Sequence, residues 1–154
     1  MKRRTTEDLA EEAWHKHLEF IQNAISRMTQ NSYLLKGWAV TLVAATFAVS
    51  ISVASVWLVA TALFPTVAFA LLDARYLREE RLFRRLYDAI RRDRDKNRHE
   101  EPAKVEAFSM DTQPYEKDVK KMWEIMLSVS ILSFYGSIAL VIVAAVIARA
   151  LVTA

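Results

Sequence analysis

Residues 37–72 contain no Asp, Glu, Lys, Arg or His, and this uncharged stretch constrains the fold more than any other feature of the chain. As one straight helix it would rise about 54 Å, whereas about 20 residues already cross the bilayer hydrocarbon. Two arrangements fit such a length. Either the stretch forms two crossings that fold back on each other, or it forms one long helix that is tilted or kinked at Pro65.

The distribution of basic residues favours the folded-back arrangement. Lys and Arg are retained on the cytoplasmic side of a membrane. Residues 1–36 carry six of them and residues 73–124 carry fourteen, so a single crossing would place one basic segment outside the cell. We therefore predict a transmembrane hairpin of two crossings over residues 34–72, with its turn near Ile51–Ser55, where serines interrupt the apolar pattern.

A second uncharged run, residues 125–148, is long enough for a third crossing. Arg149 is the only basic residue after it, so we expect the tail, residues 149–154, outside the cell. The first 36 residues lack the early apolar core of a signal peptide, and we expect them in the cytoplasm. The sequence therefore predicts an all-α, multi-span membrane protein.

Amphipathic helices are predicted for the cytoplasmic segments. In residues 1–33, apolar residues recur at helical spacing from Ala10 to Met28, which indicates a helix that packs on another helix or lies on lipid. Its acidic polar face favours packing. Residues 73–124 form a cytoplasmic helical region: a helix over 73–98, a loop over 99–114 that contains two prolines, and a helix from Tyr115 to Glu124 that leads into the last crossing.

Four arginines are predicted to share one face of the helix over residues 73–98. We call Arg78, Arg81, Arg85 and Arg92 the arginine ladder. Guanidinium groups are planar, bidentate donors that match phosphate, so we predict that the ladder binds an anionic nucleotide. Residues 75–98 hold ten basic and five acidic side chains, and the alternative is a solvated face near anionic lipid headgroups.

Ser130, Ser133 and Ser137 are predicted to share one face of the third crossing. In a symmetric oligomer, hydroxyls at these positions would form rings around an axis, as in the lining of a poorly selective pore. The alternative is helix packing, because serine can return its hydrogen bond to its own backbone. We predict that the three serines line the pore.

Catalysis and metal binding are not indicated. The chain has no cysteine, and His15, His17 and His99 do not form a cluster at metal-ligand spacing. No catalytic arrangement of His, Cys or carboxylate is visible, so we expect no enzyme, no cofactor and no metal. Composition also fits a protein of another class, a non-conducting structural or scaffolding membrane protein that recruits partners through its cytoplasmic helices.

Three segments together resemble a known family: residues 31–38 (NSYLLKGW), 72–88 (LDARYLREERLFRRLYD) and 108–111 (FSMD). They are similar to segments of the SLATT-like small membrane effectors of bacterial antiphage defence, among them the membrane subunits of Hailong systems. The resemblance covers roughly residues 20–135, and the middle segment is its most specific part.

The resemblance implies a homo-oligomeric channel of the bacterial inner membrane, expected to be a tetramer, that stays closed until a nucleotide signal arrives. Its opening would depolarise the membrane and arrest the growth of an infected cell. For Hailong systems, the family implies that the signal is a short oligodeoxyadenylate made by a partner nucleotidyltransferase. No ligand-binding residue is carried over from the family, so the arginine ladder rests on helical spacing alone.

Overall fold

The computed structural model describes residues 6–53, 55–96 and 108–153, and every regular element within these ranges is a helix. The all-α class is thereby confirmed for the described part of the chain. Three of its helices are long and apolar enough to cross a membrane. The first residues of the predicted 1–33 segment and most of the predicted 99–114 loop lie outside the described residues.

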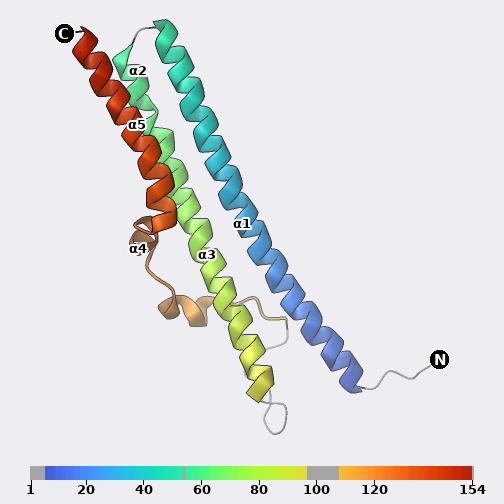
Figure 1. Ribbon diagram of the computed structural model, residues 1–154. Helices are drawn as coiled ribbons and strands as arrows, with labels where there is room; N and C mark the ends of the chain where they lie inside the picture. The colour runs from blue at the N-terminus through green and yellow to red at the C-terminus, as the bar shows by residue number, and fades with distance from the viewer. Residues whose placement is uncertain (1–5, 54, 97–107, 154) are drawn as a thin grey trace. The chain divides into compact units, whose positions relative to one another are not determined.

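The chain divides into two compact units. The charged unit comprises Met1–Thr29 and Glu79–Val119, and the apolar unit comprises Gln30–Arg78 and Lys120–Ala154. Two long helices contribute to both: α1, Thr6–Val53, with 48 residues, and α3, Leu63–Lys96, with 34 residues (Figure 1). No proline interrupts α1, so its backbone hydrogen bonds continue through both apolar and polar sequence.

The chain reverses direction between α1 and α2, Val56–Thr61, within the stretch where the sequence predicts a turn. Ser55 has extended backbone angles there, with φ −100° and ψ 120°. A second interruption at Ala62 separates α2 from α3, because Pro65 lacks an N–H and its ring clashes with the carbonyl four residues earlier. Residues 37–72 are therefore not one long helix kinked at Pro65.

The predicted continuous helix from Tyr115 to Glu124 is wrong. The structure has a 3₁₀ helix, η1, over Gln113–Asp118, then extended backbone, then the short helix α4, Met122–Met126. Val119 is buried with φ −113° and ψ 140°, which ends the helical hydrogen bonding. Periodicity over ten residues cannot distinguish one helix from two short turns around an extended residue.

The last long helix, α5, extends over Val129–Thr153. It begins later than the predicted crossing at residue 125, because the chain turns at Leu127 and Ser128. It also includes Arg149 and the residues up to Thr153, so the described part of the predicted tail is helical. An uncharged run therefore located this helix but not its ends.

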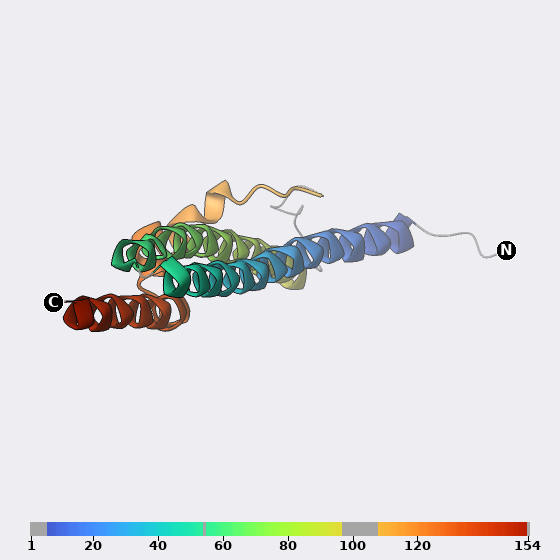
Figure 2. The ribbon, with the colours of Figure 1, turned by 90° about the horizontal axis from the view of Figure 1, so that it is seen from above.

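The apolar unit has a core between α1, α2 and α5. Val59, Ala62 and Ile142 are buried at its centre, and Figure 2 shows the three helices as neighbours. Several further apolar side chains pack against that centre: Val43, Phe47, Leu63, Ile138, Ala145 and Val146. Large apolar side chains also cover the outside, including Trp57 at 83% exposure and Phe64 at 81%. Such a surface suits lipid rather than water.

The charged unit has its own core, between α1 and α3. Leu18 and Ile21 of α1 are buried against Leu86 and Ile90 of α3. Partly buried side chains surround them, among them Tyr115 of η1. The apolar face predicted for residues 1–33 therefore packs on another helix of the same chain.

Candidate functional site

The arginine ladder lies entirely on α3. Arg85 and Arg92 are exposed, Arg81 is half-buried, and none of these three makes a hydrogen bond or ion pair with a described residue. Arg78 is half-buried, belongs to the apolar unit and has an interaction partner. The charged unit thus presents three arginines of the ladder whose donors are available to a ligand.

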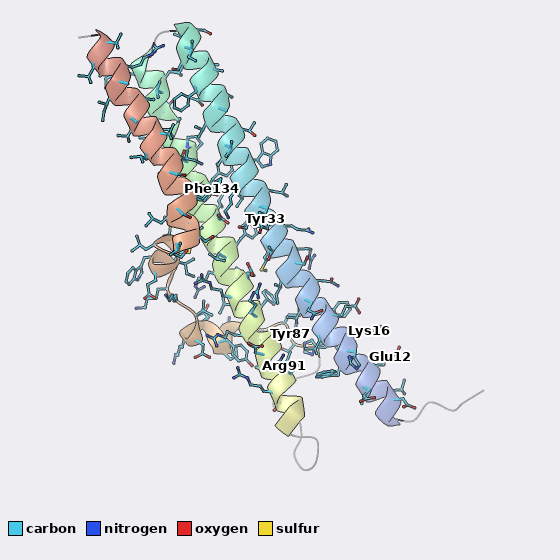
Figure 3. All side chains as sticks on the ribbon, in the orientation of Figure 1. Glu12, Lys16, Tyr33, Tyr87, Arg91 and Phe134 are labelled. Carbon is cyan, nitrogen blue, oxygen red and sulfur yellow. The ribbon has the colours of Figure 1, made fainter. Side chains whose placement is uncertain are left out.

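A groove of about 400 Å³ lies between α1 and α3 in the charged unit. Gln22, Ile25 and Ser26 line it from α1, and Arg84, Tyr87 and Asp88 line it from α3. The amide of Gln22 donates a hydrogen bond to the Tyr87 hydroxyl over 3.1 Å, which links the two helices. Figure 3 labels Tyr87 on the side of α3 that faces α1.

Arg84 is held by an acidic neighbour one turn earlier on α3. Its Nε and Nη2 donate to Oε1 of Glu80 over 2.8 and 2.7 Å. The Glu80 side chain is only 12% exposed, whereas that of Arg84 is 62% exposed. Arg84 therefore compensates a largely buried carboxylate and offers less net charge to an anion than the unpaired arginines do.

A polar cluster joins α1 to α3 in the apolar unit. Lys36 Nζ donates to Asp73 Oδ2 over 2.5 Å and to Ser32 Oγ over 2.8 Å, and the Ser32 hydroxyl donates to Asp73 Oδ1. Asp73 has no exposed side-chain surface, and Lys36 keeps 19%. Buried charges are costly unless paired. The two charged residues that bound the uncharged stretch therefore hold its ends together.

Tyr135 of α5 lies beside this cluster. Its hydroxyl is buried and close to the Asp73 carboxylate, without a hydrogen bond of standard geometry. Three helices of the apolar unit thus bring polar atoms to one place. Buried ionisable groups within an apolar bundle are commonly conformational or functional elements.

His17 of α1 forms hydrogen bonds with the backbone of Phe108 and Ser109 in the charged unit. Its Nδ1 accepts the Phe108 N–H over 3.3 Å, so Nε2 carries the proton and donates to the Ser109 carbonyl over 2.9 Å. Phe108 has φ 63°, a conformation that non-glycine residues rarely adopt. The buried histidine therefore has a structural role, and no cluster of three metal-binding side chains occurs among the described residues.

Tyr115 has a raised pKa in the charged unit. Burial is the main cause, and the negative charges of Asp93 and Asp118 add to it. Each of these effects disfavours the phenolate. The folded charged unit therefore favours the neutral phenol of Tyr115.

The three serines predicted to line a pore are exposed on α5. They lie on the side opposite to the buried Ile142 and Tyr135. The Ser137 hydroxyl donates to the Phe134 carbonyl over 2.8 Å, the backbone bond expected for the packing alternative. Lining a pore requires a symmetry axis shared with other subunits, and helix packing at these serines requires a helix from another chain.

Comparison with protein-family models, with curated proteins and with solved structures finds no match for this chain. Sequence reasoning missed the groove and the polar cluster. A lysine and an aspartate directly outside one uncharged stretch were the available signal for the cluster, whereas the groove depends on helix pairing.

Proposed function

We propose that the protein is an ion channel of the bacterial inner membrane that a nucleotide opens, and that it acts as an antiphage effector. The observation that carries this proposal is the continuity of α3. This one helix contributes to the apolar unit and also to the charged unit, where it carries three arginines that have no partner among the described residues. A ligand that binds these arginines acts on a helix that also forms part of the hairpin.

Phosphate is the ligand group that suits the arginine ladder. Arg81, Arg85 and Arg92 recur at spacings of four and seven residues, which aligns them along one face of a helix. Their free donors can bind the phosphates of a short single strand, and this binding should weaken with salt because each neutralised phosphate releases counterion. The resemblance to SLATT-like effectors supports an oligodeoxyadenylate made by a partner nucleotidyltransferase.

Gating follows if the ligand binds the open arrangement more tightly than the closed one. The exposed serines of α5 support a homo-oligomer, with a tetramer as the expected form, because rings of hydroxyls around its axis offer ions a hydrated path. Opening would depolarise the membrane and stop growth of the infected cell.

The experiment reconstitutes the full chain in liposomes and measures ion flux after addition of short oligodeoxyadenylates. We expect flux from the wild type, and loss of both binding and flux in Arg81→Glu/Arg85→Glu. Lysine at both positions should give an intermediate result, because it keeps the charge but loses the bidentate geometry. The control, Arg3→Glu/Arg4→Glu, changes charge equally outside the ladder and should retain flux.

Three results would contradict parts of this proposal. Binding without flux in the wild type would favour the non-conducting scaffold. If Arg81→Glu/Arg85→Glu and Arg3→Glu/Arg4→Glu lose binding to the same degree, the arginine ladder contributes only through the overall charge of the chain. Unchanged binding in both would place the ligand elsewhere on the chain.

A further inference from the structure

The groove between α1 and α3 contains a carboxylate, that of Asp88, without a partner among the described residues. Asp88 is half-buried and makes no hydrogen bond or ion pair with a described residue. The Ser26 hydroxyl, which also lines the groove, has no such partner either. A ligand in the groove is therefore favoured if it brings hydrogen-bond donors.

Asp88 also lies between arginines of the ladder. It follows Arg85 by three residues and precedes Arg92 by four, so the three side chains are neighbours on one surface of α3. The structure has no ion pair between Asp88 and either arginine. A negative charge at this position weakens the attraction for phosphate and suits instead a part of the ligand that donates hydrogen bonds.

The remaining groove surface suits a flat ring. Tyr87 contributes an aromatic ring and Ile25 an apolar side chain, while Gln22 contributes an amide. Nucleobases stack on aromatic side chains, and a volume of about 400 Å³ lies within the range of small-molecule sites.

We propose that this groove binds an amino-substituted base of the triggering nucleotide, with Asp88 accepting hydrogen bonds from the amino group while the ladder holds the phosphates. The assignment rests on the proposed function in taking a nucleotide as the ligand. It adds the base-reading site and the residue that sets base preference.

The test compares adenosine monophosphate with inosine monophosphate, whose base carries a carbonyl in place of the amino group. Calorimetry on the full chain in lipid nanodiscs measures both affinities. We expect wild type to prefer adenosine monophosphate by about tenfold or more, because a carboxylate cannot donate to the carbonyl. Asp88→Asn should remove or reverse the preference, because its amide can donate.

The matched control is Glu79→Gln, which makes the same charge change on the same helix. Glu79 is half-buried and lies nine residues before Asp88, on the opposite side of α3. This variant should keep the wild-type preference. A preference unchanged in Asp88→Asn, or no binding of adenosine monophosphate to wild type, would overturn the assignment.

The two proposals fail separately. If Asp88→Asn abolishes base preference but no nucleotide produces flux, the groove stands and the channel proposal falls. If oligodeoxyadenylate opens the channel and the Asp88→Asn preference equals that of wild type, the channel proposal stands and the groove assignment falls.

Discussion

Replacing Lys36 by methionine tests the polar cluster of the apolar unit. The variant leaves the Asp73 carboxylate fully buried without its cation. Removing one partner of a buried ion pair costs about 3–5 kcal/mol. The carboxylate can avoid a larger penalty by taking up a proton, and protonating an ordinary aspartate at pH 7 costs about 4 kcal/mol. The cost of leaving Asp73 unpaired is therefore limited to the same range. We therefore expect Lys36→Met to lower the free energy of unfolding by about 3–4 kcal/mol.

The reverse change should cost less. In Asp73→Asn the ammonium of Lys36 loses its counter-charge, but its side chain is 19% exposed and a flexible stem can carry the charge toward water. We expect a loss of about 1–2 kcal/mol, mainly from the lost charge-assisted hydrogen bonds. The double variant Lys36→Met/Asp73→Asn contains no unpaired charge and should be more stable than Lys36→Met alone.

Reversible unfolding of the full chain in mixed micelles, followed by tryptophan fluorescence, measures these free energies. The control is Arg84→Met, which breaks the pair with Glu80; it should cost less than Lys36→Met, because the Glu80 side chain keeps 12% exposure whereas that of Asp73 keeps none. If the losses from Lys36→Met and Asp73→Asn simply add in the double variant, the two side chains are not coupled and the reasoning is refuted.

Three further predictions concern topology, conduction and alkaline pH. In this cysteine-free chain, Asp95→Cys should resist labelling in intact spheroplasts and react after permeabilisation; labelling beforehand would contradict a cytoplasmic position. Ser133→Leu and Ser137→Leu should reduce liposome flux at unchanged subunit number, because apolar rings favour dewetting, and full flux in both would remove this face from the pore. Burial and nearby carboxylates raise the pKa of Tyr115 by penalising its phenolate, so stability is fully present below the ordinary tyrosine pKa of about 10 and is lost as pH rises from there through the folded value. Unfolding measured between pH 9 and about 11 should therefore show a steeper loss in wild type than in Tyr115→Phe, and equal slopes would contradict this.

Local pattern located the long helices and the hairpin turn near Ser55, but it was poor for the other connections. Residues 37–72 and 125–148 located the apolar helices, and the face around Leu18 and Ile21 indicated a packed amphipathic helix. The ends of α5 and the break at Val119 were missed. An apolar run shows which residues are unfavourable in contact with water. The position of a helix end depends instead on which neighbouring groups form hydrogen bonds with the terminal backbone N–H and C=O groups.

The sequence by itself determined the class of fold and the arginines that share one face of α3, because both follow from residue type and spacing along one helix. Only the tertiary structure decided that Lys36 pairs with Asp73, that His17 holds Phe108 and Ser109, and that Asp88 opens onto a groove. Each of these contacts joins segments far apart in the chain. These contacts depend on the register between helices and on the path of the loops. Neither can be derived from the types of the two residues in contact.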